Sequence, residues 1–148
     1  MSFNIVMAEK ITEFLGEPVL EGYIELAGDI EYFHAPVSFW TREQYIESWK
    51  RSFSEGYAGK KHSALIVSMR DPLQTNFLFL WVLYFEGVKV FVQNKILFLD
   101  EIGEVFEQEK VNDYIGERVK VNYEGVKISE WEIEHDEVFG FFTNLASA

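Results

Sequence analysis

The chain has 148 residues, of which 48% are hydrophobic and 17% aromatic, and its formal net charge is −12 at pH 7. This length suits one domain over residues 1–148 with a single core, because such a chain buries about 70% of the surface exposed when it is unfolded. The acidity argues against general binding to nucleic acid or anionic membranes and favours a basic partner. The absence of cysteine excludes disulfides, thiolate nucleophiles and cysteine-based zinc sites.

Two further features predict a cytoplasmic protein. The charged side chains of Glu86, Lys89 and Lys95 interrupt the most hydrophobic region well before the roughly 18 apolar residues of a membrane span. Residues 1–17 contain neither a basic leader nor a continuous apolar segment, so no export signal is expected.

The first regular pattern lies between Val19 and Val37. Two extended stretches flank Gly28-Asp29, and apolar and polar residues alternate along the first of them. This pattern predicts a β-hairpin. Pro36 has no N–H to donate to a sheet, so it should end the second strand or lie at an edge.

The segment from Arg42 to Glu55 carries the strongest helix signal. Thr41 is suited to cap its first turn, and Gln44, three residues later, completes a capping box. Gly56 is a natural C-terminal stop. The apolar residues recur at the spacing of one helical face, which should cover part of a sheet: Tyr45, Ile46, Trp49 and Phe53.

Apolar runs predict the middle of the sheet. The runs from Ala64 to Met69 and from Phe77 to Phe85 are too apolar for half-exposed strands, so both should be interior strands. Glu86-Gly87 predicts a tight turn into an alternating strand from Val88 to Gln93, and Ile96 to Leu99 continues it.

The C-terminal third predicts one more hairpin and a helix. Val119 to Tyr123 and Val126 to Ile133 flank a turn at Glu124-Gly125, and a change of phase in the second strand predicts a bulge near Ser129-Glu130. Asp136 is the expected N-cap of the helix, whose apolar face comprises Val138, Phe139, Phe142 and Leu145. Several hairpins with about two helices favour an α+β domain, an antiparallel or mixed β-sheet packed by helices.

No arrangement of residues points to catalysis. The three histidines, His34, His62 and His135, lack a recognised catalytic context, and there is no G-x-S-x-G elbow or glycine-rich phosphate loop. We therefore expect no catalytic residue and no cofactor.

Acidic side chains do not by themselves indicate a metal or acid–base site. Glu134-His135-Asp136 offers ligand types at successive positions, whose side chains point in different directions along a strand, so no metal site is expected. Glu130, Glu132 and Glu134 should share one face of a strand. In so acidic a chain, neighbouring carboxylates of this kind arise by chance. Acid–base catalysis by two carboxylates would also need an apolar cleft that shifts the pKa of one of them.

Five motifs occur in an order typical of one family. They are Phe39-Trp40-Thr41-Arg42-Glu43-Gln44-Tyr45 through Trp49, Ser63-Ala64-Leu65-Ile66 through Asp71-Pro72, Trp81-Val82-Leu83-Tyr84 with Glu86-Gly87, Val92-Gln93-Asn94 with Ile96-Leu97-Phe98, and Gly125-Val126-Lys127-Ile128-Ser129-Glu130-Trp131. In this order the chain resembles the immunity proteins of bacterial contact-dependent growth inhibition. The matching stretches run through most of residues 36–133.

The resemblance implies a non-catalytic inhibitor that binds the C-terminal toxin domain of a cognate CdiA-like effector by occlusion. Such toxin domains are often nucleases with basic surfaces, which the acidity of this chain would complement. Because the shared motifs are rich in apolar residues, we expect them to define the scaffold and not the recognition surface. We place recognition between Glu101 and Glu124, with these toxin-binding residues: Glu101, Glu104, Glu107, Asp113, Tyr114, Glu117, Tyr123 and Glu124.

Three alternatives stay open. The acidic hairpin with Glu21, Glu25, Asp29 and Glu31 competes as the recognition surface. A small-molecule-binding or hydrolytic α+β domain is a second function, and a deep cavity with two or more convergent polar groups would favour it. Nucleic-acid binding through the basic side chains of residues 42–61 is a third, which the net charge opposes.

Overall fold

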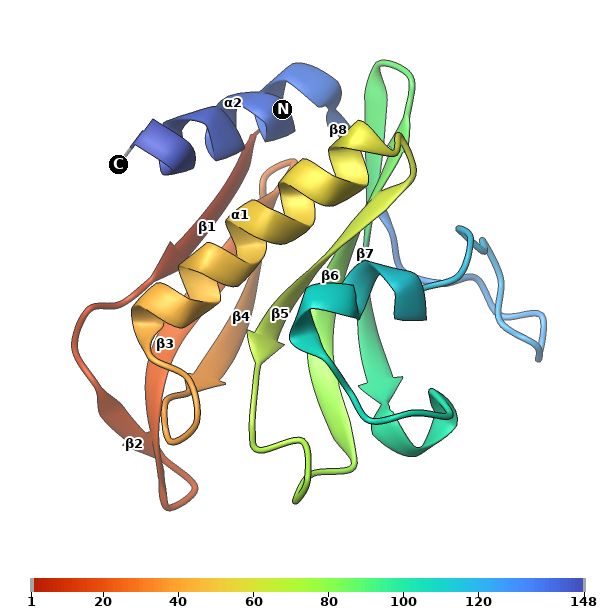
Figure 1. The fold of residues 1–148 in the computed structure, drawn as a ribbon. Helices are drawn as coiled ribbons and strands as arrows, with labels where there is room; N and C mark the ends of the chain where they lie inside the picture. The colour runs from red at the N-terminus through yellow and green to blue at the C-terminus, as the bar shows by residue number, and fades with distance from the viewer. Residues whose placement is uncertain (1, 148) are drawn as a thin grey trace.

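Two four-stranded antiparallel sheets form the framework of residues 2–147, the part of the chain that the computed structural model describes (Figure 1). The first sheet comprises β1 (Phe3–Met7), β2 (Thr12–Phe14), β3 (Glu17–Leu26) and β4 (Asp29–Pro36). The second comprises β5 (His62–Ser68), β6 (Phe77–Glu86), β7 (Lys89–Phe98) and β8 (Trp131–Glu134) in that order. The helical elements are α1 (Arg42–Ala58), α2 (His135–Ser147) and the 3₁₀ segments η1 (Leu99–Glu101) and η2 (Gln108–Tyr114). The α+β class predicted from sequence is confirmed, with the strands divided between two sheets.

β3 is the central strand of the first sheet. β4 pairs along one of its edges, and β1 and β2 follow one another along the other. The predicted β3–β4 hairpin is confirmed, and it turns through Ala27 and Gly28, both with positive φ. Pro36 is the last residue of β4, where its missing N–H does not interrupt the ladder.

Of the two predicted interior strands, β6 pairs on both sides within the second sheet, whereas the prediction is wrong for β5, which is buried but lies at the edge of the sheet. β6 and β7 pair over their whole length, from Glu86 opposite Lys89 to Phe77 opposite Phe98. Residues 80–84 of β6 are buried on both faces, whereas nearer the start of the strand Leu78 is buried and Phe77 and Phe79 are exposed. One face of the sheet is therefore open at that end.

The start of α1 agrees with the sequence and its end does not. Thr41 and Gln44 form the predicted capping box, with both reciprocal hydrogen bonds present. The predicted stop at Gly56 is wrong, because the helix continues to Ala58 and is capped at Gly59. Gly56 is needed for a different reason: a Cβ atom there would lie 2.0 Å from the backbone oxygen of His62. The glycine lets α1 lie directly against β5.

Side chains from the helices close the free edge of β5. Trp49 Nε1 donates to the Ile66 oxygen at 2.7 Å, and Ser52 Oγ donates to the Ala64 oxygen at 2.6 Å. The Ala64 N–H donates to Asn112 Oδ1 on η2 at 2.7 Å. Edge groups that would invite another strand are thus satisfied within the chain.

One buried hydroxyl joins the two sheets. Tyr45 Oη donates to the Pro36 oxygen at the end of β4 at 2.6 Å, and accepts the Met69 N–H just beyond β5 at 2.9 Å. Tyr45 is fully buried, and Trp40 packs edge-on against its ring. α1 therefore holds the adjacent edges of the two sheets at a fixed separation (Figure 1).

The C-terminal third differs most from the prediction. The expected hairpin around Glu124-Gly125 is reduced to an isolated bridge between Val121 and Lys127, and only residues 131–134 form a strand. Without a strand there is no bulge at Ser129-Glu130. The valines whose alternation predicted these strands are not packed against the core. Their side chains are about half exposed: Val119, Val121 and Val126.

The last helix is confirmed with a shifted start. α2 begins at His135, so Asp136 lies in its first turn and is not the N-cap. Val138 and Phe142 are buried as expected, and Phe142 stacks on Phe53 of α1 at 4.1 Å between ring centroids. Within residues 2–147, no helix has the length and apolar character needed to cross a bilayer.

Two glycines in helices provide a test of the contact between α1 and β5. Gly56→Ala should lower the free energy of unfolding by about 1 to 3 kcal/mol, because the added methyl group collides with the β5 backbone. Gly140→Ala in α2, where nothing lies within 4 Å of the added atom, should raise it by about 0.5 to 1 kcal/mol. Urea unfolding measures both values. Equal stabilisation of the two variants would show that α1 does not contact β5 in this way.

Candidate functional site

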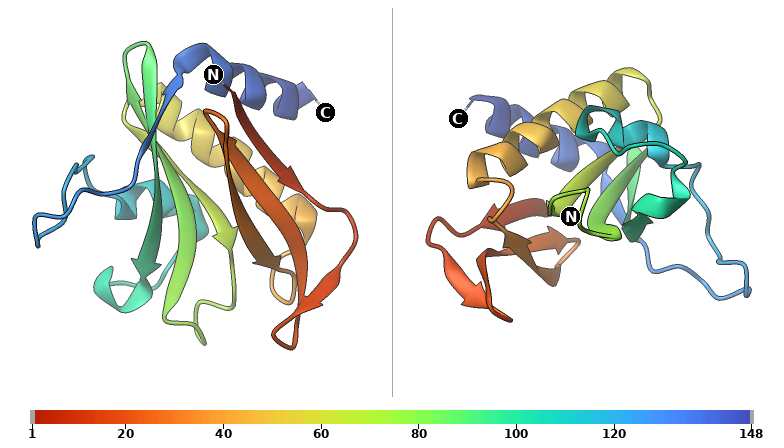
Figure 2. Two further views of the ribbon diagram at one scale, coloured as in Figure 1. Left: turned by 180° about the vertical axis from the view of Figure 1, so that it is seen from behind. Right: turned by 60° about the horizontal axis from the view of Figure 1, so that its bottom comes forward.

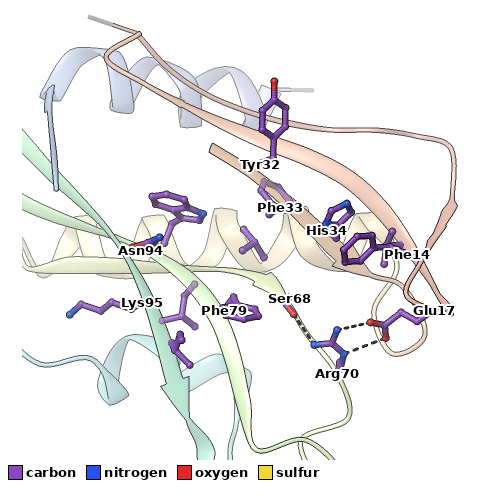
Figure 3. A pocket seen from close by; sticks show the side chains of 15 residues that line it. Phe14, Glu17, Tyr32, Phe33, His34, Ser68, Arg70, Phe79, Asn94 and Lys95 are labelled. Atoms are coloured by element: carbon purple, nitrogen blue, oxygen red, sulfur yellow. Dashed lines mark hydrogen bonds and ion pairs between the residues drawn. The ribbon is translucent and has the colours of Figure 1, made fainter. Parts of the chain in front are cut away.

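A groove of about 530 Å³ lies between the two sheets. The left view of Figure 2 looks onto the face of the two sheets that α1 does not cover. The first sheet lines the groove from β2, β3 and β4, and the second lines it from β5, β6 and β7. The groove exists because the sheets are joined at neighbouring edges while their outer faces diverge. In the close view of Figure 3, aromatic and apolar side chains occupy most of its walls.

Aromatic side chains stay accessible on both walls. On the first sheet, the Phe14 ring stacks on His34 with 3.8 Å between centroids, and Tyr32 is 79% exposed. On the second sheet, Phe79 and the paired Ile96 are 43% and 48% exposed. Exposed apolar side chains that gather in one concave site form a candidate binding surface.

Charged groups lie at the two ends of the groove. Arg70 donates to both carboxylate oxygens of Glu17, at 2.5 and 3.3 Å, and to Ser68 Oγ at 3.1 Å (Figure 3). Lys95 lies at the opposite end, where partial burial lowers the pKa of its ammonium group. Because Glu17, Arg70 and Ser68 are bonded to one another, they brace the wall and do not converge as free catalytic groups.

Part of the predicted recognition segment forms a second surface around η2. The Tyr114 hydroxyl accepts the Glu107 N–H at 3.0 Å, and Glu107 pairs with Lys110 at 3.0 Å. Partial burial, followed by the nearby Glu104 carboxylate, raises the pKa of Tyr114. Glu101, Asp113 and Tyr114 line a hollow of about 390 Å³ with residues 96–98 of β7.

The other predicted residues lie apart from these. Glu117, Tyr123 and Glu124 belong to the segment 115–130, which projects away from the second sheet (Figure 1). Tyr123 is 96% exposed, and Asn122 Oδ1 accepts the Glu124 N–H at 2.9 Å in a tight turn. The eight predicted residues therefore divide into two surfaces.

Arg118, which the sequence did not single out, anchors the projecting segment. Its guanidinium donates to both Glu130 oxygens, at 2.5 and 2.8 Å, and to Glu86 at 3.1 Å, and lies 3.6 Å from the centre of the Phe91 ring. Hydrogen bonding from Arg118 lowers the pKa of Glu130. The prediction that Glu130, Glu132 and Glu134 share one strand face is wrong, because β8 begins at Trp131 and Glu130 lies before it. Glu132 and Glu134 both pair with Lys89.

The competing acidic hairpin borders the groove. Glu21 lies directly opposite His34 across the β3–β4 ladder, on the same face of the sheet. Asp29 accepts a hydrogen bond from Trp131 Nε1 at 2.9 Å, which links the hairpin to β8. Glu25 accepts one from the Ser2 hydroxyl. Some of these carboxylates therefore have structural partners, and Glu21 is exposed beside the groove.

The basic side chains of α1 are engaged within the chain. Arg42 donates to the Met7 oxygen at 3.1 Å, Lys50 pairs with Glu47 at 3.3 Å, and Arg51 pairs with Glu109 at 3.7 Å. These contacts reduce the free positive charge of residues 42–61, which weakens the case for a nucleic-acid surface.

The histidines lie on separate elements in structural contacts. His62 Nε2 is 2.8 Å from the Asn112 oxygen, and His135 Nε2 is 2.8 Å from the Tyr57 hydroxyl. His34 stacks on Phe14. Among the described residues there is no group of three or more His, Cys, Asp or Glu side chains placed to hold a metal ion.

Comparisons with known proteins agree with one another. Residues 35–141 match the family described as the CdiI N-terminal domain. The immunity protein CdiI of Enterobacter cloacae subsp. cloacae is 43% identical over 137 residues, covering 88% of this chain and 94% of that protein. A chain in the solved CdiA-CT/CdiI toxin and immunity complex from Enterobacter cloacae matches with a TM-score of 0.93 and 40% identity, over 99% of each chain.

Proposed function

The chain belongs to the CdiI immunity protein family, and we propose that it binds and neutralises the C-terminal toxin domain of a cognate CdiA-like effector in the cytoplasm. The observation that carries this proposal is the match over 99% of both chains to a chain from a toxin and immunity complex. The described surface adds physical support, because it combines an open apolar groove with a strongly acidic chain. Such a surface suits occlusion of a basic protein.

The net charge of −12 favours a toxin with a basic surface, such as a nuclease that must hold a polyanion. Complementary charge raises the association rate and disfavours other partners, whereas well-packed central contacts slow dissociation. Both properties serve a protein that must capture a lethal domain before it acts.

Co-expression with the cognate toxin domain tests the immunity function. Cells that produce the toxin should grow only when this chain is also produced, and the two proteins should elute together in size-exclusion chromatography. An unrelated toxin domain serves as the control, because specific neutralisation should not extend to it. Growth inhibition that persists despite abundant folded protein would refute the proposal.

We also propose that neutralisation requires no catalysis by this chain. His62 Nε2 contacts the Asn112 oxygen, and the Glu17 carboxylate is paired with Arg70, so both side chains have structural partners and lie on different elements. Purified protein should show no hydrolase or nuclease activity, with or without added divalent metal. Activity that survives extensive purification and disappears in His62→Ala would overturn this expectation.

We propose that the toxin is recognised by the segment from Glu101 to Glu124, and association kinetics test this. Reversing Asp113 and Glu117 to Lys should slow association with the toxin by about tenfold at low salt and change dissociation less, because rim charges steer encounters over about 8 to 10 Å. Surface plasmon resonance at low and high salt measures both rates. Raising the salt should reduce the difference in association rate between the variant and the wild-type protein.

A matched control separates local from overall charge. Reversing the exposed Glu9 and Glu43 to Lys changes the net charge by the same amount, in a hollow that no residue of 101–124 lines. If the two double variants associate equally slowly, overall charge and not this segment steers the toxin. Wild-type rates for the Asp113 and Glu117 variant would remove the segment from the interface and favour the acidic hairpin.

A further inference from the structure

We propose that the groove between the two sheets is the centre of the toxin interface, where it receives an apolar side chain flanked by Lys or Arg on the toxin. This inference rests on the proposed immunity function and adds the surface and the chemistry of recognition. Neither shared sequence motifs nor the acidic segments alone identify this surface, because its walls come from strands far apart in the chain.

The groove exposes large apolar side chains in a concave site. Phe14 and Tyr32 on one wall face the same cavity as Phe79 and Ile96 on the other. Each of these four large side chains is at least 41% exposed. Aromatic anchors in pockets at the middle of an interface carry most of the binding energy in protein complexes.

The groove is continuous with an acidic rim. Ile96 lines both the groove and the hollow that contains Glu101 and Asp113. Phe77 and Phe98 pair across the strands beside it and are partly exposed. An apolar centre bordered by charged groups is the usual anatomy of a specific protein interface.

The opposite rim of the groove also carries negative charge. Residues 11–41 contain six carboxylates and neither lysine nor arginine. Of these, Glu21 is exposed and lies opposite the groove-lining His34. A partner that covers the groove therefore meets negative charge on both sides, which selects a basic protein segment over an acidic or neutral one.

Interactions within the chain hold the groove in a preformed shape. The Arg70–Glu17 pair braces its mouth, and the Trp131–Asp29 hydrogen bond ties β8 to the β3–β4 hairpin. Tyr45 fixes the separation of the sheets beneath them. A preformed site loses little conformational entropy on binding, so its contacts contribute more fully to affinity.

Two phenylalanines of equal exposure allow a matched test. Phe79 in the groove is 43% exposed, and Phe139 on α2 is 42% exposed. Phe79→Ala and Ile96→Ala should each weaken toxin binding about 10- to 100-fold, mainly through faster dissociation. Phe139→Ala should change the affinity less than about threefold. Its ring contacts Phe53, Tyr57 and His135, so this variant should lose more stability than Phe79→Ala.

The outcomes separate this inference from the proposed function. If wild-type protein fails to bind the toxin domain, the immunity function itself is wrong. If wild-type protein binds and folded Phe79→Ala and Ile96→Ala variants bind equally well, the groove is not the centre of the interface. Tyr32→Ala repeats the test from the opposite wall and removes a ring that is 79% exposed, so thermal stability should change little.

A small-molecule role for the groove gives a different pattern. Toxin binding would then be unaffected by all three groove variants, which would overturn the inference. Protection of cells that produce the toxin provides a second readout. Phe79→Ala should protect less well than Phe139→Ala at equal protein levels, although Phe139→Ala is expected to be less stable.

Discussion

The arrangement of the two sheets depends on the buried hydroxyl of Tyr45. It donates to the Pro36 oxygen and accepts the Met69 N–H, so it satisfies backbone groups at the ends of strands in different sheets. Burial raises the pKa of this hydroxyl, which keeps it protonated and able to donate. A buried polar group left without its partner costs about 1 to 3 kcal/mol. Separation of the sheets would leave three such groups unpaired, and this cost holds their adjacent edges together.

The groove follows from that junction. Two twisted sheets fixed at one pair of edges diverge on the face that no helix covers, and the N-terminal half of β6 has an open face there. On the other face, Trp49 and Ser52 satisfy the free edge of β5, so α1 protects the strand that would otherwise recruit partners through its backbone. The chain therefore offers side chains at the groove for recognition and little free backbone at β5.

Local signals predicted the elements whose determinants are local. The Thr41 capping box, the β3–β4 and β6–β7 turns and the apolar strands were all recognisable, because each depends on residues within one turn or hairpin. Gly56 was misread, since the close approach of β5 that requires it is a tertiary contact. The valines between residues 119 and 126 alternate like a strand, but no core faces them. The groove was not predictable, because Phe14 and Phe79 meet only after the sheets join.

The acidic segments and the groove suit different stages of one binding event. Carboxylates such as Asp113 and Glu21 lie at exposed rims, where solvent and salt weaken any single ion pair, so their main contribution is to attract and orient a basic partner. Phe79 and Ile96 lose water when they are covered, and the favourable free energy of burying apolar surface is not screened by salt as an exposed ion pair is. Long-range charge therefore governs how quickly the partner arrives, and the apolar centre governs how long it stays. An immunity protein needs both, since a toxin that is captured quickly but released quickly still acts.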